Sequence, residues 1–279
     1  MAQQARKSKS RKRRRRRSRG GTSVVLVLLC LVIAIAAILT AVTVFFKVRQ
    51  FKLTGNTRYT LEEIVEASGM HQGDNLVLFN KFAVIDKMFD AFPYLDEVQI
   101  RRRLPDTVEI LVTDCKPAAV LQDTPATVPD PKDKKGEKML QIGNTGSWLI
   151  DRNGKLLEKA GAQSAGKLTL VRGVTLWEPQ VGTYAKFSDE DVKKPLLLLL
   201  NTAEEDGILQ NIGEMDFSEQ YNIRFTYTDR FTVNIGSTEN LNKKLRYLHL
   251  IVEEKLGTNA VGVLDISDTQ KARFVPKNN

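Results

Sequence analysis

Cysteine and histidine are scarce in this chain, with two of each among 279 residues. Cys30 lies within a long apolar run and Cys115 lies far outside it, so the two cannot form a bridge within one molecule. The part that follows the apolar run therefore depends on its hydrophobic core and not on disulfides. His71 and His249 have no Cys, His or carboxylate neighbours at ligand spacing. We expect no metal site and no cofactor.

Charged side chains are absent from residues 20–46, a run of 27 residues. A hydrocarbon core of about 30 Å needs about 20 apolar residues in a helix, and residues 24–46 supply 23. We therefore predict one transmembrane helix over 24–46. Residues 34–36 read Ala-Ile-Ala, which fits a signal-peptide cleavage site. Ten more apolar or small residues follow them, which favours an uncleaved anchor.

Acidic side chains are absent from residues 6–19, which contain eleven Lys or Arg. Lys and Arg gather on the cytoplasmic side of membrane helices, so we expect residues 1–23 to be a cytoplasmic tail and the chain beyond residue 47 to lie outside. Basic residues also attract anionic lipid headgroups, by about 1 kcal/mol each. We assign this role to Arg11, Arg13, Arg14, Arg15, Arg16 and Arg17. Without the tail, 31 basic residues face 33 acidic ones, a net charge of −2, so nucleic-acid binding is not expected.

Residues 47–118 indicate a compact α+β domain. A short strand precedes a helix that begins at the capping box of Thr60 and Glu63. A second helix ends at Pro93 and has apolar residues at spacings of three and four, namely Phe82, Ile85, Met88, Phe89 and Phe92. Two strands with alternating apolar residues then flank a turn at Pro105. The predicted order is strand, helix, helix, strand, strand.

The composition changes between residues 122 and 146. This stretch contains Pro125, Pro129 and Pro131 and a cluster of charges at residues 132–138. A polar, proline-rich composition is typical of a mobile linker or a long surface loop, and we predict such a segment over 119–147. A partner-binding segment is the alternative interpretation.

Residues 148–276 indicate a second domain made mostly of strands, followed by a tail of residues 277–279. Asn153 and Gly154 form the strongest short signal for a β-hairpin. Later strands are predicted at residues 168–171, 222–227, 231–235 and 261–266.

Two helices are predicted among these strands. One begins at Ser188 with Asp191 as its cap, contains Leu196, Leu197, Leu199 and Leu200, and is expected to kink at Pro195. The other covers residues 238–256 and ends before a glycine. Its apolar stripe consists of Leu241, Leu245, Leu248, Val252 and Leu256. Both stripes are more typical of a core than of a partner-binding seam.

Motifs of known enzymes are incomplete. Residues 161–167 match most of a phosphate-binding loop, but Leu168 stands where a Ser or Thr would hold Mg²⁺. Ser164 and Lys167 fit the Ser-x-x-Lys pair of penicillin-interacting enzymes, but no Lys-Thr-Gly sequence accompanies them. Cys115 is a candidate nucleophile, yet it lacks the preceding Thr-Leu-x-Thr of sortases. We predict a protein that is not an enzyme.

Short motifs are spread over the chain beyond the membrane segment. They are Phe-Lys-Leu-Thr-Gly-Asn-Thr-Arg-Tyr-Thr at 51–60, Ser-Gly at 68–69, Gly-Asp-Asn-Leu at 73–76, Pro-Tyr-Leu at 93–95 and Arg-Leu-Pro-Asp-Thr-Val-Glu-Ile at 103–110. Together they closely resemble the POTRA domain of the FtsQ/DivIB cell-division family. The second domain resembles the same family at residues 149–154, 172–173, 240–245 and 263–266. One departure is residues 114–117, where the family usually has Glu-Arg before x-Pro-Ala.

The resemblance implies a fold and a topology. The fold class is α+β: a single-pass membrane helix, an extracytoplasmic POTRA domain of order β-α-α-β-β, and a mixed, mostly antiparallel β domain with two helices. The protein would be located at the division septum of a bacterial cell membrane.

The resemblance also implies partners. The family forms a complex with FtsL and FtsB/DivIC, small bitopic coiled-coil proteins, and this complex regulates septal peptidoglycan synthesis, so septal peptidoglycan synthases are further candidates. A partner strand would add to the sheet edge near the C-terminus. This edge would comprise Val263, Leu264, Asp265, Ile266, Ser267, Ala272, Phe274, Val275 and Pro276. Some branches have Arg at the position of Ser267, so an ion pair there is not expected.

The resemblance implies one further site, and two other functions remain as alternatives. Septal recruitment would use Ile100 and Arg102 of the POTRA domain, although core packing also accounts for Ile100. A POTRA scaffold for protein assembly or translocation, or a membrane-anchored cell-wall enzyme, would be the competing functions.

Overall fold

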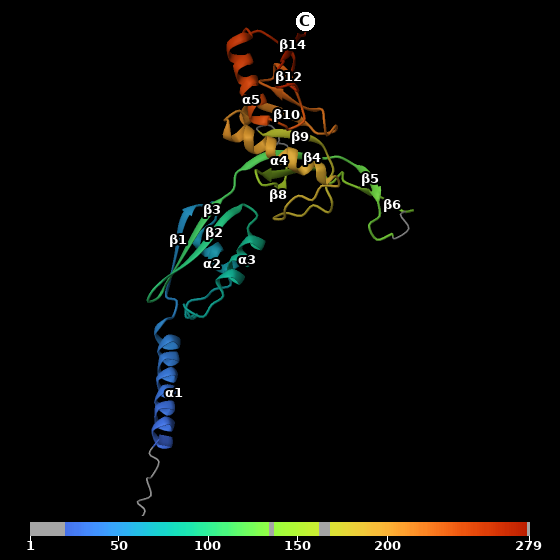
Figure 1. Cartoon of the computed structure of the whole chain (residues 1–279). Coiled ribbons are helices and arrows are strands. Elements are labelled where there is room, and N and C mark those ends of the chain that lie inside the picture. Colours follow the sequence, from blue (N-terminus) through green and yellow to red (C-terminus); the bar gives the residue numbers. More distant parts are fainter. Residues whose placement is uncertain (1–19, 134–136, 162–167, 278–279) are drawn as a thin grey trace, which may run out of the picture. The chain divides into compact units, whose positions relative to one another are not determined.

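The structure, a computed structural model, describes residues 20–133, 137–161 and 168–277 (Figure 1). The six arginines assigned to lipid binding and the motif-like residues 162–167 lie outside these ranges. The described chain forms two compact units. One joins the N-terminal helix up to Gln50 to residues 71–79 and 102–108, and the other contains residues 51–70, 80–101 and 109 onwards.

Helix α1, Gly20–Phe45, is the predicted membrane helix (Figure 1). Its part from Val24 to Phe45, 22 residues, is long and apolar enough to cross a membrane by length and composition. The apolar side chains of this part are largely exposed. An apolar helix that no protein core covers is typical of a segment that lies in lipid.

The predicted order of the POTRA elements is confirmed. They are β1 (Gln50–Asn56), α2 (Leu61–Ser68), α3 (Lys81–Ala91), β2 (Leu95–Arg103) and β3 (Thr107–Asp114), and the strands form a sheet of order β1-β3-β2. Gly55 lies on β1 with φ +117°, and a Cβ there would collide with the Val112 carbonyl on β3. Glycine is required at this position of the strand because the backbones of β1 and β3 approach closely there.

Helix α2 begins at the predicted capping box. The Glu63 N–H donates to Oγ1 of Thr60 at 3.3 Å, and the Thr60 N–H donates to Oε2 of Glu63 at 2.8 Å. The Thr60 hydroxyl also donates to Oε2 of Glu63, at 3.0 Å, and the bonds from the Thr60 N–H and hydroxyl hold the pKa of the Glu63 carboxyl below its usual value. Gly69 ends the helix in the left-handed conformation, which costs glycine no steric strain.

The predicted apolar face of α3 is wrong in part. Phe82 is exposed, whereas Val84 and Met88 are buried. Asn80 caps the helix by accepting from the N–H groups of Phe82 and Ala83. The inward face therefore carries Val84 and Met88, four residues apart, and Phe82 lies in the first turn on another face.

Nine strands form the main sheet, which is mixed and mostly antiparallel, as predicted. Its order is β14-β13-β12-β11-β10-β9-β4-β7-β8. The bounds are β4 Pro117–Asp123, β7 Ser147–Asp151, β8 Leu156–Lys159, β9 Thr169–Val174, β10 Ile212–Asp216, β11 Ile223–Tyr227, β12 Phe231–Gly236, β13 Gly262–Asp265 and β14 Arg273–Pro276. The predicted hairpin at Asn153 and Gly154 joins β7 to β8, and Ile150 pairs with Leu156.

The linker predicted over 119–147 is corrected at its start. Strand β4 lies between β9 and β7 inside the sheet, and its residues from Ala118 to Leu121 are buried. Asp123 is buried and accepts from the N–H groups of Thr145 at 2.9 Å and Leu176 at 2.8 Å. The rest of the segment contains a hairpin of β5 (Ala126–Pro129) and β6 (Met139–Ile142).

Both helices of the second domain differ in detail from the prediction. Helix α4, Glu190–Glu205, is capped by Asp189, not Asp191, and Leu197 is only half-buried. Helix α5, Leu241–Leu250, is followed by a π-helical turn, Ile251–Lys255, and a 3-10 turn, Leu209–Asn211, precedes β10. The remaining leucines of the two stripes pack with the sheet in one hydrophobic core, which confirms their structural interpretation.

Candidate partner-binding edge

Strand β14 is the outermost strand at one end of the nine-stranded sheet (Figure 1). It pairs antiparallel with β13, which in turn pairs parallel with β12. The register places Val263 opposite Val275 and Leu264 opposite Phe274. The predicted residues from Val263 to Asp265 and from Phe274 to Pro276 are therefore brought together as two neighbouring strands.

The two faces of this strand pair differ. Leu264 and, just beyond β13, Ile266 are buried, and the Phe274 ring contacts the Phe231 ring edge to face at 6.1 Å between centroids. On the other face Val263 and Val275 are 45% and 46% exposed. Cross-strand pairs of β-branched residues stabilise a sheet, and an exposed pair beside an edge is an apolar contact surface for an added strand.

The backbone of β14 has groups that point away from β13. The Lys277 N–H donates to the Val261 carbonyl at 2.9 Å, which makes these two a hydrogen-bonded pair. Such pairs alternate along antiparallel strands, so Val275 bonds to β13 while the N–H and C=O of Phe274 point outward. The outward carbonyl of Pro276 has no accompanying N–H, because proline lacks one. This edge offers one donor and two acceptors.

The turn after β13 holds itself together. Oδ1 of Asp265 accepts from the Ser267 N–H at 2.9 Å and from the Ser267 hydroxyl at 2.6 Å. Ser267 therefore stabilises its own turn. Ala272 is exposed and lies immediately before β14.

A buried lysine supports the strands next to this edge, and sequence reasoning missed it. Lys244 is 2% exposed, and its ammonium donates to the carbonyls of Ile235 and Ser237, each at 2.8 Å. Burial lowers the pKa of Lys244. The only signal in the sequence is its position three residues after Leu241 and one before Leu245, which places it on the inward face of α5.

The two residues predicted for septal recruitment differ in exposure. Ile100 is buried in the POTRA domain, and Val98 on the same strand is buried as well. Arg102 is exposed, donates to the Phe79 carbonyl at 2.8 Å and lies 4.6 Å from the centre of the Phe79 ring. The structure thus gives Ile100 a packing role, and its recruitment role stays a prediction.

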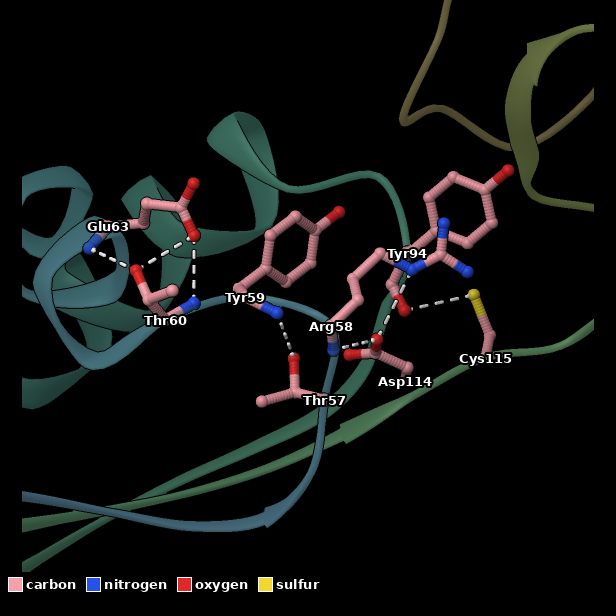
Figure 2. A network of polar contacts seen from close by, with 8 residues as sticks. All are labelled: Thr57, Arg58, Tyr59, Thr60, Glu63, Tyr94, Asp114 and Cys115. Atoms are coloured by element: carbon pink, nitrogen blue, oxygen red, sulfur yellow. Dashed lines mark hydrogen bonds and ion pairs between the residues drawn. The ribbon is translucent and has the colours of Figure 1, made fainter.

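Asp114, the acid at the departure from the family pattern, is part of a polar network (Figure 2). The Arg58 N–H donates to Oδ2 of Asp114 at 2.8 Å, and Arg58 Nε lies 3.5 Å from the same oxygen. The Arg58 guanidinium lies 3.5 Å from the centre of the Tyr94 ring, a cation–π contact. The network links the segment before α2 to the residue before β2 and to the last residue of β3.

Cys115 takes part in this network as a hydrogen-bond donor. Its thiol donates to the Tyr94 carbonyl at 3.2 Å, and the side chain is buried (Figure 2). Burial, the largest cause, raises the pKa of Cys115 to about 11. A nucleophilic cysteine needs a populated thiolate, and this environment favours the neutral thiol. Within the described ranges, no group of three or more His, Cys, Asp or Glu side chains is arranged to hold a metal.

Two family models match this chain. Residues 46–114 match the FtsQ-type POTRA domain, and residues 139–267 match the C-terminal domain of the cell division protein FtsQ/DivIB. The matched ranges contain the POTRA elements and every strand of the nine-stranded sheet except β4 and β14.

Relatives over most of the chain carry the same names. The cell division protein DivIB of Clostridium botulinum (strain Loch Maree / Type A3) is 26% identical over 228 residues, which cover 80% of this chain and 79% of the relative. The cell division protein FtsQ of Geobacter sp. (strain M21) is 23% identical over 237 residues, covering 84% and 77%. FtsQ of Corynebacterium glutamicum (strain ATCC 13032) is 23% identical over 217 residues, covering 75% and 81%. With its apolar helix, its POTRA domain and its β domain in this order, the chain belongs to the FtsQ/DivIB family of cell-division proteins.

Proposed function

We propose that this protein is a bitopic scaffold of the bacterial division machinery and not an enzyme. Family membership supports a role in cell division. The N-terminal tail lies in the cytoplasm, with its arginines at anionic headgroups, α1 crosses the membrane, and the POTRA and β domains act outside it. Its partners are FtsL-like and FtsB/DivIC-like coiled-coil proteins, and the complex helps to regulate septal peptidoglycan synthases.

The observation that carries this proposal is the outward-facing backbone of β14. The N–H and C=O of Phe274 and the C=O of Pro276 lack a partner strand within the described chain. An added strand would satisfy them and give affinity, while side chains next to the exposed Val263 and Val275 give specificity. We assign the partner strand to this edge.

Two other surfaces belong to the proposal. Arg102 is exposed on the POTRA domain, and we propose that it contributes to septal recruitment. Ile100 contributes from within the core, by holding β2 in place. A variant Ile100→Ala would then impair recruitment together with stability, whereas Arg102→Ala would impair recruitment without a loss of stability.

The experiment that tests the scaffold proposal measures binding of the full chain, in lipid nanodiscs, to the external segments of FtsL-like and DivIC-like partners. A second protein ends after Lys271 and lacks β14. Binding that disappears with β14, at an unchanged unfolding temperature of the remaining protein, supports the edge. Equal binding by both proteins places the partner elsewhere, and absence of binding by either contradicts the scaffold assignment.

A further inference from the structure

The C-terminal end of α1 is capped by a residue from a distant loop. The last four carbonyls of an α-helix have no partner within the helix. Nδ2 of Asn75 donates to one of them, that of Val42, at 3.0 Å. The Leu76 N–H donates to the carbonyl of Phe46 at 2.8 Å, just after the helix. Unpaired carbonyls are costly near a bilayer core, so these bonds stabilise the helix end where it leaves the membrane.

Residues 71–79, which we call the membrane-proximal loop, are held beside the chain that follows α1. The Val48 N–H donates to the Asp74 carbonyl and the Gly73 N–H donates to the Val48 carbonyl, both at 2.8 Å. Lys47 and Asn75 form an antiparallel bridge, and Val48 is buried. Loop and helix end therefore form one structural unit.

The same asparagine shapes the loop. Oδ1 of Asn75 accepts from the N–H groups of Val77 at 2.9 Å and Leu78 at 3.0 Å.

Val77 and Leu78 are 41% and 67% exposed, and Leu104 of the same unit is 64% exposed. Residues 102–108 join this unit through the Arg49 N–H, which donates to the Asp106 carbonyl at 2.8 Å. We call these exposed apolar side chains of the unit that contains α1, those of Val77, Leu78 and Leu104, the apolar patch.

Cations lie in the same unit as the apolar patch. Lys47, Arg49 and Arg102 are exposed there. Apolar side chains flanked by Lys and Arg are typical of segments that lie in the interface of a bilayer, where the apolar groups enter the acyl boundary and the cations meet phosphates.

The 22 residues from Val24 to Phe45 span about 33 Å at about 1.5 Å each, close to the thickness of a hydrocarbon core of about 30 Å. The turn that Asn75 caps thus lies at the boundary of that core.

We propose that the apolar patch is a second membrane contact of this protein. Val77, Leu78 and Leu104 insert into the leaflet at which α1 ends, and Lys47, Arg49 and Arg102 bind the phosphates of its anionic phospholipids. The bilayer is the occupant because the loop is bonded to the last turn of the helix that crosses it. The inference rests on α1 spanning a membrane, as in the proposed function.

The test measures how deep single fluorescent labels lie in nanodiscs that contain phosphatidylglycerol. Three full-length proteins each contain one cysteine. The first keeps the native Cys30 in α1 and carries Cys115→Ser. The other two carry Leu78→Cys or Val181→Cys, and both native cysteines are changed to Ser. Val181 is the matched control, since it is a half-exposed apolar residue of the other unit. Lipids with a spin label near the headgroup quench labels that lie at the bilayer interface.

We expect the label at position 78 to lose most of its emission and the label at 181 to lose none. In the label-78 protein, Arg49→Gln or replacement of phosphatidylglycerol by a zwitterionic lipid should reduce the quenching. If the label at 78 is not quenched, while the Cys30 label in its own protein is quenched by spin labels in the middle of the lipid chains, this inference alone is overturned. An unquenched Cys30 label refutes the span itself. A label at 78 that becomes shielded only when a partner protein is added assigns the patch to protein and also overturns the inference.

Discussion

Lys244 shows how a single buried charge can hold two segments of backbone. Its ammonium is the donor for two carbonyls, those of Ile235 and Ser237. Lys244→Met keeps most of the apolar stem and leaves both carbonyls without this donor, and each unsatisfied buried group costs about 1–3 kcal/mol. We expect a loss of about 2–6 kcal/mol in the free energy of unfolding, measured by denaturant titration.

The neighbouring Lys243 provides the control, because it is exposed. Lys243→Met should change the free energy of unfolding by less than about 0.5 kcal/mol. Equal effects of the two substitutions would show that Lys244 contributes through its stem only, and not through its hydrogen bonds.

Cys115 makes a prediction about pH. Its pKa is raised from 9.0 to about 11 in the folded protein, so between these values the unfolded chain loses the thiol proton and the folded chain retains it. The contribution of the Cys115 thiol to the free energy of unfolding is therefore fully present below pH 9 and is lost as the pH rises through about 11. The difference in free energy of unfolding between the wild type and Cys115→Ala should therefore shrink over this window.

The comparison with Cys115→Ala cancels the titration of tyrosines and lysines common to both proteins. A difference that stays constant from pH 8 to beyond pH 11 would mean that the thiol titrates normally. In that case the nucleophile hypothesis for Cys115 would deserve renewed consideration.

At the scale of elements, β14 allows its backbone to be tested separately from its side chains. Phe274→Pro removes the outward N–H, while the inward bonds belong to Val275. Phe274→Leu removes the ring contact with Phe231 but keeps the N–H. We expect the proline variant to bind the partner segment about tenfold more weakly than the leucine variant, which corresponds to about 1.4 kcal/mol.

The measurement is a binding titration of both variants, with thermal unfolding to confirm that β14 remains paired. Equal affinity of the two variants would exclude an added strand at this edge and favour a contact through side chains.

Elements with a local signal were predictable, and elements that depend on distant pairing were not. The capping box of Thr60 and Glu63 and the turn at Asn153 and Gly154 act within a few residues, and both are confirmed. Strand β4 begins at Pro117 and is buried because β7 and β9 flank it. Its neighbours are 24 or more residues away in the chain, so no local pattern reveals it.

The candidate site was predictable only through the family resemblance. Residues 263–267 have an apolar alternation that is consistent with any strand, and nothing in it indicates an edge. Which groups of Phe274 and Pro276 point outward depends on the register with β13. Lys244 gives no sequence signal beyond its helical spacing, since lysines are mostly exposed.

At the scale of the whole molecule, only Cys115 and Lys116 separate β3 of the POTRA domain from β4 of the main sheet. Lys155 adds a further link, because its buried ammonium donates to the Leu95 carbonyl at 3.1 Å. We therefore expect the two domains to unfold in one calorimetric transition. Lys155→Met should lower the midpoint of this transition or split the transition into two. Lys159→Met, at an exposed lysine, should leave the midpoint unchanged. Two separate transitions in the wild type would contradict this coupling.

Asn75 has a mechanical consequence for the membrane anchor. It binds the last turn of α1 with its amide N–H and the turn at Val77 and Leu78 with its amide oxygen. Because the loop is hydrogen-bonded directly to the helix end, a torque on α1 would reach the loop directly. A rotation of α1 about its own axis would then turn residues 71–79 with it. The helix would transmit rotation to this loop in addition to holding the protein in the membrane.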